Sequence, residues 1–259
     1  MRRLLGLLFC LGLAVAPAAL TFAAPAAMAD DRPEYVIGVE ELDYYPAYAV
    51  QDGAYVGAAR EIFDAFAADA GIAFRYQPLP VNRLYADLTG GGIDFKFPDN
   101  PHWNPTAKAG SEVAYSAPVI AYIDGVMVRP ARKGREADAL ATLGTVTGFT
   151  PFSWLDRIED GRVRLSENAQ MRPLLRQVMT DRIDGAYVNV AVASHLLAAD
   201  FGDAGALVFD ADLPHSRDAY RLSAVRHPDL IARFNAWLAA NGARVAEIKA
   251  RYGAERGLD

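Results

Sequence analysis

The sequence predicts an α/β protein built from two successive lobes. Three observations lead to this fold class. Short runs of β-branched and aromatic residues alternate with segments of helical periodicity, glycine-rich turns separate them, and the order of elements in the first half recurs in the second. Strands that alternate with helices favour largely parallel sheets. Such lobes bind small molecules at the carboxyl ends of strands, in the cleft between them.

The elements of the first half follow from local patterns. The apolar run at residues 35–39 predicts the first strand, and the polar and aromatic segment at residues 40–48 predicts a loop. Residues 58–70 predict a helix that Gly71 ends, because one face carries the apolar residues Ile62, Phe63, Phe66 and Ala70. Further predictions are strands at 72–76, 93–97 and 122–129, a short helix at 82–88 and a turn-rich loop at 98–105.

The second half repeats this order. Strands or extended segments are predicted at residues 143–147, 163–165, 183–188 and 207–209, and helices at 153–158, 172–180 and 190–199. A turn is predicted at residues 148–150, where the hydroxyl of Thr150 and neighbouring backbone N–H groups are expected at the start of a helix. Two further helices are predicted near the C-terminus, at residues 228–240 and 243–252.

Residues 1–29 have the pattern of a secretory signal peptide. Arg2 and Arg3 give a positively charged start, an apolar run covers residues 4–15, and Ala27-Met28-Ala29 is an A-x-A cleavage pattern. The alternative is a membrane anchor, but the apolar run is shorter than the roughly 20 residues that span a bilayer. We therefore expect cleavage before Asp30 and export to the periplasm. Cys10, the only cysteine, falls within this leader, which excludes disulfides and thiol chemistry from the exported chain.

Composition excludes several classes of function. The net charge is −6, and without the two leader arginines the chain carries 24 basic and 32 acidic residues, a net charge of −8. An acidic chain without a basic run argues against nucleic acid and anionic membranes as partners. The sequence has no metal-ligand spacing among its four histidines, no glycine-rich phosphate loop after a strand and no G-x-S-x-G elbow. We therefore expect no cofactor and no metal.

Six short motifs occur in a defined order along the chain. They are Tyr35-Val36-Ile37-Gly38-Val39-Glu40, Gly91-Gly92-Ile93-Asp94, Tyr115-Ser116-Ala117-Pro118-Val119, Gly148-Phe149-Thr150, Asp181-Arg182-Ile183-Asp184-Gly185-Ala186, and a closing segment from Asn241-Gly242 to Tyr252-Gly253. In this order and spacing they resemble the family 3 extracellular solute-binding proteins, the polar amino-acid receptors of ABC importers. The resemblance covers nearly the whole chain after the leader.

This resemblance implies a two-lobed periplasmic binding protein type II fold with a hinge and an interlobe cleft. It implies a first lobe from residues 30–122 plus 213–259 and a second lobe from residues 123–212. It also implies a function without catalysis. A monomer would capture a small polar or aromatic solute by hinge closure and deliver it to an inner-membrane ABC permease.

The residues that grip an amino-acid backbone in this family are changed here. By the resemblance, an arginine after the third strand binds the ligand carboxylate and an acid on the second lobe binds the ammonium. Residues 98–105 contain no arginine, and the acidic position corresponds to Asn189, while Glu40 keeps its negative charge. Because a buried charged ligand group needs an opposite charge or several hydrogen bonds, an ordinary α-amino acid is not the expected ligand.

Candidate ligand-binding residues follow the predicted strands. They are Glu40, Tyr44, Tyr45, Arg83, Asp99, Asn100, Trp103, Thr150 and Asn189. Aromatic faces beside carboxylates suit a cationic or aromatic amine, whereas Arg83 and Lys96 suit an anion, so the sequence leaves the charge of the ligand open. Structural interpretations stand beside these: the tyrosines pack under the loop, and Arg83 pairs with Asp87 one helical turn on. Asp94 and Asp184 are expected to fix local backbone.

Two other functions fit the same pattern. One is a periplasmic accessory or sensor subunit that reports a ligand to a membrane or redox partner, since fold does not fix function. The other is an enzyme similar to cyclohexadienyl dehydratases, in which Glu40 or Asp99 would act as a buried general acid in the interlobe cleft.

Overall fold

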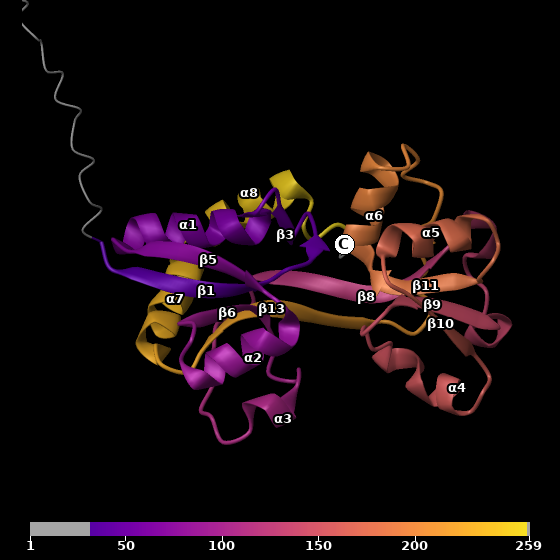
Figure 1. Cartoon of the computed structure of the whole chain (residues 1–259). Coiled ribbons are helices and arrows are strands. Elements are labelled where there is room, and N and C mark those ends of the chain that lie inside the picture. The colour runs from indigo at the N-terminus through magenta and orange to yellow at the C-terminus, as the bar shows by residue number, and fades with distance from the viewer. Residues whose placement is uncertain (1–31, 258–259) are drawn as a thin grey trace, which may run out of the picture. The chain divides into compact units, whose positions relative to one another are not determined.

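The computed structural model describes residues 32–257, so the predicted leader lies outside the described residues. The first lobe (Figure 1) contains the strands β1 (Glu34–Glu40), β2 (Asp43–Tyr44), β3 (Tyr48–Gln51), β4 (Ala54–Val56), β5 (Ala73–Leu79), β6 (Phe95–Asp99) and β7 (Ala114–Tyr115). Its helices are α1 (Ala58–Ala70), α2 (Val81–Gly90), α3 (Pro105–Lys108), α7 (Pro228–Ala240) and α8 (Gly242–Tyr252). Among the described residues, no helix is both long and apolar enough to cross a membrane.

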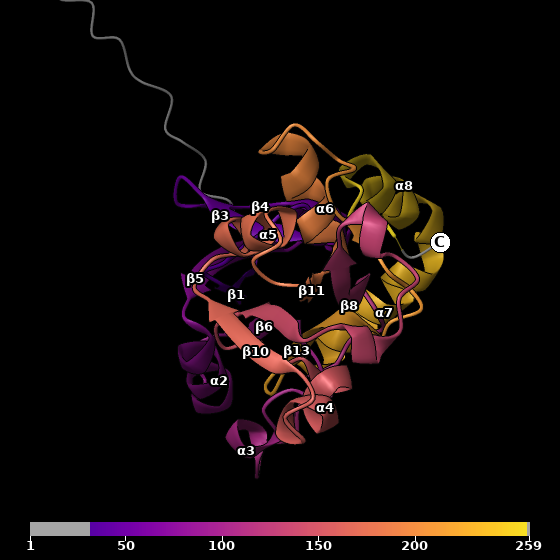
Figure 2. The ribbon, with the colours of Figure 1, turned by 90° about the vertical axis from the view of Figure 1, so that its right-hand side faces the viewer.

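The second lobe follows the first along the chain and has the same alternation of strands and helices. Its strands are β9 (Thr142–Val146), β10 (Arg164–Asn168), β11 (Gly185–Asn189) and β12 (Val208–Phe209), and its α-helices are α4 (Leu155–Glu159), α5 (Met171–Met179) and α6 (Val190–Ala199). Short 3₁₀ turns are η1 (Pro130–Arg132), η2 (Ala137–Ala139) and η3 (Phe152–Trp154). In Figure 2 this lobe faces the viewer, with β10 crossing in front.

Two long strands, β8 (Ile120–Val128) and β13 (Ser216–Ala224), join the lobes. The sheet order is β10-β9-β11-β8-β13-β6-β1-β5. At one end β8 pairs with β11 of the second lobe, at the other β13 pairs with β6 of the first, and between these regions the two strands pair with each other from Ser216↔Asp124 to Tyr220↔Ile120. Both connections between the lobes therefore lie side by side in one antiparallel ribbon (Figure 1).

Separate apolar cores support the two ends of this sheet. One cluster is drawn from residues 37–122 and 220–254, with Phe63, Phe97 and Phe234 fully buried at its centre. Two further clusters are drawn from residues 123–207 and 126–213, around Leu174, Trp154 and neighbouring aliphatic side chains. The buried residues change cluster between Tyr122 and Ile123 and again between Leu213 and Tyr220, and the predicted lobe boundaries stay a prediction.

The structure matches the helix predictions closely and departs from the sheet prediction. Helices α1, α6 and α7 have the predicted bounds, and Gly71 ends α1 in the left-handed conformation with φ of 68°. The prediction of largely parallel sheets is wrong for the centre of the large sheet, because β8 and β13 pair antiparallel. The predicted loop at residues 40–48 contributes to a small antiparallel sheet, β2-β3-β4. β13 was missed because its sequence, SRDAYRLSA, has no continuous apolar run.

Two aspartates fix equivalent junctions in the two lobes. Asp94, just before β6, accepts a hydrogen bond from the backbone N–H of Val36 in β1 at 2.8 Å. Asp184, just before β11, accepts hydrogen bonds from the backbone N–H groups of Ala141 and Thr142 at 2.9 and 2.8 Å, next to β9. Each carboxylate thus ties the start of one strand to the neighbouring strand, which confirms the structural role predicted for these two residues.

Asp184→Ala is expected to lower the free energy of unfolding by about 1 to 2 kcal/mol, because the half-buried N–H of Thr142 and the N–H of Ala141 lose their acceptor. Burial raises the pKa of Asp184, but hydrogen bonds from Thr142 and Ala141 and the charge of Arg132 outweigh burial and hold this pKa below its ordinary 3.8. A lowered folded-state pKa contributes stability above the ordinary value and loses it as the pH falls. Urea unfolding should therefore show a deficit at pH 7 that shrinks below about pH 4.

Asp138→Ala is the matched control for this experiment, because the Asp138 side chain is 70% exposed and pairs only with surface arginines. It should cost less than about 0.5 kcal/mol. Equal losses for the two variants would show that Asp184 does not hold the β9–β11 junction.

Candidate functional site

One face of the β8–β13 ribbon carries polar and aromatic side chains. In an antiparallel ladder, directly paired residues project to the same face. Asp124 pairs with Ser216, and Tyr122 pairs with Asp218. The rings of Tyr122 and Tyr220 stack with centroids 4.5 Å apart. The two strands that connect the lobes therefore present two carboxylates and two tyrosines together.

Aromatic side chains from the first lobe complete an aromatic cluster around this face. Tyr48 meets Tyr220 edge to face at 5.6 Å, and Trp103 does so at 6.0 Å. Tyr44 of β2 stacks on Tyr48 at 5.5 Å and lies 6.5 Å from Phe149, which belongs to the second lobe. We define the aromatic cluster as Tyr44, Tyr48, Trp103, Tyr122 and Tyr220.

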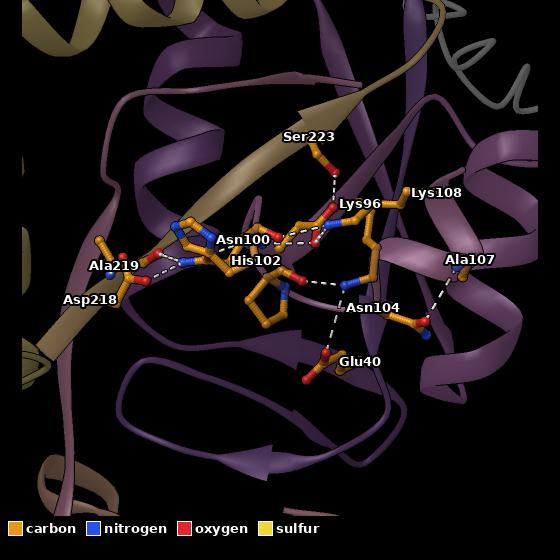
Figure 3. Close-up of polar contacts among 12 residues, drawn as sticks. Glu40, Lys96, Asn100, His102, Asn104, Ala107, Lys108, Asp218, Ala219 and Ser223 are labelled. Atoms are coloured by element: carbon orange, nitrogen blue, oxygen red, sulfur yellow. Dashed lines mark hydrogen bonds and ion pairs between the residues drawn. The ribbon is translucent and has the colours of Figure 1, made fainter. Parts of the chain in front are cut away.

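Glu40 at the end of β1 is held inside the first lobe by a lysine. Lys96 of β6 is fully buried, lies 3.7 Å from a Glu40 oxygen, and donates a hydrogen bond to the carbonyl of Pro98 (Figure 3). Tyr48 donates its hydroxyl to the other Glu40 oxygen at 2.9 Å. Burial raises the pKa of Glu40, opposed by Lys96 and Tyr48. The negative charge of Glu40 is therefore matched by Lys96 within the lobe.

Asp99 and Asn100 at the end of β6 anchor the loop that follows. Asp99 is fully buried and accepts from the Ser223 hydroxyl at 2.7 Å, with Lys108 at 3.4 Å from its other oxygen. Asn100 donates to Asp218 at 2.8 Å and to the carbonyl of Ala219 (Figure 3). Asp99 is thus paired with a cation, whereas Asp218 is bonded by a neutral amide.

Asp124 and Asn189 meet where the second lobe begins. Asn189 caps α6 through a hydrogen bond from the backbone N–H of Val192 at 3.1 Å, and its amide donates to the Tyr220 hydroxyl at 3.1 Å. One oxygen of Asp124 is buried and has no hydrogen-bond partner among residues 32–257. Burial raises the pKa of Asp124 to about 7, a hydrogen bond from Asn189 lowers it, and the charge of Asp218 raises it.

A cavity of about 330 Å³ opens beside the aromatic cluster. Tyr44 lies in its wall together with Leu42 and Asp43 from the first lobe, and the opposite wall includes Val146, Met171 and Leu196 from the second. This volume is at the lower end of the range for small-molecule sites. A second hollow, of about 380 Å³, lies on the outer side of the first lobe between α1 and α8. Arg251 and Glu61, which form an ion pair, both lie in the wall of that hollow.

The structure brings together six of the nine predicted site residues and places three elsewhere. Glu40, Tyr44, Asp99, Asn100, Trp103 and Asn189 lie in or directly behind the cluster. Arg83 instead forms an ion pair with Asp87 at 2.8 Å with its side chain 66% exposed, which is the structural interpretation of this residue. The ring of Tyr45 lies with its centroid 4.6 Å from that of the half-buried His195.

Thr150 was expected at a helix start and is not at one. It is exposed and precedes Pro151 and the three-residue turn η3, and its carbonyl accepts from the N–H of Phe152 at 2.9 Å. Ligand contact by each of the nine residues stays a prediction. Sequence reasoning missed Asp124, Tyr122, Asp218 and Tyr220 on the connecting strands. For Asp124 a signal was available, because it is the only charged residue in the otherwise apolar strand Ile120–Val128.

The chain has the two-lobed fold of solved periplasmic binding proteins and of a related sensor domain. An ancestral arginine-binding protein bound to arginine superposes with a TM-score of 0.64 at 17% identity, over 85% of this chain and 98% of that one. The sensor domain of a histidine kinase with similarity to periplasmic binding proteins gives 0.64 at 16%, over 86% and 97%. The second substrate-binding domain of a putative amino acid ABC transporter from Streptococcus pneumoniae gives 0.61 at 16%, over 84% and 99%.

These similarities confirm, at the level of fold, the resemblance to family 3 binding proteins that the motifs indicated. No family model and no curated protein matches the sequence.

Proposed function

We propose that this chain is a periplasmic solute-binding protein that captures a small polar or aromatic solute between its lobes and passes it to an ABC permease. The observation that supports this most is the cavity with walls from both lobes beside the aromatic cluster on the connecting strands. A ligand in this cavity contacts both lobes, and β8 and β13, which connect the lobes, are the elements expected to bend when the lobes close. We propose binding without catalysis.

An ordinary α-amino acid is not the proposed ligand. The loop after β6 carries no arginine, and its polar residues Asp99 and Asn100 are already bonded within the first lobe. Asn189 supplies an amide where an ammonium would need a carboxylate, and it caps α6. A ligand carboxylate in this site would therefore meet no arginine from the β6 loop.

Solute binding is tested by thermal unfolding of the protein purified from the periplasm, screened against amines, organic acids and the standard amino acids. A ligand that binds only the folded state at about 100 times its Kd adds about 2.7 kcal/mol, a melting-point rise of roughly 5 to 10 °C for a chain of this size. We expect such a rise with a compound other than a standard amino acid. A rise with a standard amino acid would overturn the proposed ligand, and no rise with any class would overturn the proposed function.

Hinge closure can be measured separately, by fluorescence energy transfer between the two lobes. Cys10, the only cysteine, lies in the predicted leader, so Gln51→Cys and Arg182→Cys place a pair of fluorophores on exposed positions of the two lobes without competing thiols. The ligand found in the thermal screen should raise energy transfer between them. Binding with unchanged energy transfer would contradict capture by closure.

The identity of the membrane partner distinguishes a transport function from a sensing function. The proposed permease should capture the ligand-bound protein from solution more tightly than the ligand-free protein, since only a differential affinity transmits the closed state. The sensor alternative requires instead a membrane kinase or redox partner that binds the ligand-bound protein more tightly than the ligand-free protein.

The raised pKa of Asp124 favours one further candidate, proton-transfer catalysis by a buried carboxyl in the cleft. Conversion of arogenate by the purified protein, lost in Asp124→Asn, would establish it. If arogenate stays intact after prolonged incubation, this catalytic alternative is rejected and the proposed solute binding stands.

A further inference from the structure

The four carboxylates around the aromatic cluster differ in their partners. Glu40 is paired with Lys96, and Asp99 with Lys108, and both pairs are buried in the first lobe. Asp218 is bonded by the amide of Asn100 and by the backbone N–H of Ala219, which are neutral donors. Asp124 receives a neutral hydrogen bond from Asn189. Asp124 and Asp218 thus accept hydrogen bonds from neutral groups, and one oxygen of Asp124 has no hydrogen-bond partner among residues 32–257.

Asp124 faces ionisable and polar groups from four elements. Asp218 and Tyr220 come from β13, Tyr44 from β2, and Tyr187 and Asn189 from β11, next to Tyr122 on its own strand. None of these groups carries a positive charge. The buried Asp124 oxygen without a partner is therefore an acceptor surrounded by aromatic rings and by a second carboxylate.

The ring arrangement selects the kind of cation. An aromatic face attracts a positive charge held within about 6 Å of the ring, and this attraction grows when water is excluded. A metal ion such as calcium or magnesium requires six or more oxygen ligands, and residues 32–257 contain no group of three or more acidic, histidine or cysteine side chains placed to hold one. Rings with one free carboxylate oxygen fit an organic cation better.

We propose that the ligand is a small organic cation of the amine class, with its positive nitrogen against the free oxygen of Asp124 and its carbon groups against the rings of Tyr44, Tyr122 and Tyr220. This inference rests on the proposed solute-binding function and names the substrate class of that site. Arg83 and Lys96, which made an anion possible from sequence, do not oppose it, because Arg83 is exposed against Asp87 and Lys96 is paired with Glu40.

Tyr44 connects the cavity to this site. Its ring lines the cavity and stacks on Tyr48. Burial and then the charges of Asp124 and Glu40 raise its pKa, which places its hydroxyl within the field of both carboxylates. A solute in the cavity therefore contacts Tyr44, whose hydroxyl lies in the field of Asp124. The cavity wall also carries Arg172, whose positive charge is paired with Asp200.

The experiment compares cations with uncharged compounds of the same shape by isothermal titration calorimetry at pH 8. The probes are phenethylamine with 2-phenylethanol and 3-phenylpropionate, and choline with 3,3-dimethylbutan-1-ol. At least one cation should bind at least tenfold more tightly than its neutral partner, and 3-phenylpropionate should bind more weakly than either. Asp124→Asn should weaken binding of that cation at least tenfold, while Asp138→Asn, at an exposed position, leaves it unchanged.

A second measurement needs no variant. Because the pKa of Asp124 is about 7, its ionised fraction rises with pH, and affinity for the cation should rise about tenfold between pH 6 and pH 8. If neutral or anionic probes bind as tightly as the cations, or if only organic acids shift the melting point, the amine proposal is overturned and solute binding stands. If no compound of any class binds, both proposals fall.

Discussion

Replacing Asp124 by asparagine is expected to raise the free energy of unfolding of the ligand-free protein at pH 8, by on the order of 2 to 4 kcal/mol. The cause is the cost of keeping a carboxylate ionised in a buried position with one oxygen unpartnered. The folded-state pKa of about 7 lies about three units above the ordinary 3.8, and each unit corresponds to about 1.4 kcal/mol. The amide of asparagine needs partners of its own, so the gain falls short of the full amount.

The sign of the pH dependence follows from the direction of this shift. A carboxyl whose pKa is raised on folding favours the folded state while it is protonated, and this contribution is lost as the pH rises from about 4 to about 7. Urea unfolding of both proteins at pH 4, 6 and 8 should therefore show little difference at pH 4 and the full gain at pH 8. A variant that is less stable than the parent at every pH would show that Asp124 is a structural residue.

Such a gain would have a functional meaning. Binding sites commonly keep groups that destabilise the unliganded protein, because their stabilisation comes from the ligand. If Asp124→Asn makes the ligand-free protein more stable and also lowers its affinity for the amine, Asp124 lowers the stability of the free protein and contributes to ligand binding.

Lys96→Met is expected to have the largest destabilising effect of a single substitution near the site, about 3 to 5 kcal/mol. Lys96 is fully buried, pairs with Glu40 at 3.7 Å, and lies 4.5 Å from the centroid of the Tyr85 ring. Methionine has a similar length and fills the space, so most of the loss comes from leaving Glu40 buried without its cation.

The double variant Glu40→Gln/Lys96→Met separates charge from packing. It should recover at least half of the loss, since no unpaired charge remains. Lys133→Met is the control, because Lys133 is exposed, and it should change stability by less than about 0.5 kcal/mol. Urea midpoints at constant m-value are the measurement. A double variant as unstable as Lys96→Met alone would show that packing, and not the uncompensated charge of Glu40, causes the loss.

The sequence by itself determined what depends on local pattern. Helices α1, α6 and α7 have the predicted bounds because apolar periodicity and the residues that end a helix are local properties. The sequence analysis also expected Asp94 and Asp184 to fix local backbone, and they do. The two-lobed arrangement followed from the repeated order of elements.

Only the tertiary structure decided which charges meet. Lys96 and Arg83 were equal candidates for an anion site, and their roles differ because one is enclosed with Glu40 while the other reaches Asp87 at the surface. The strand β13 forms because β6, β7 and β8 lie beside it, and its own sequence shows no apolar run. Asp124 became the centre of the candidate site for the same physical reason: whether a buried carboxylate has a partner depends on residues far away in the sequence.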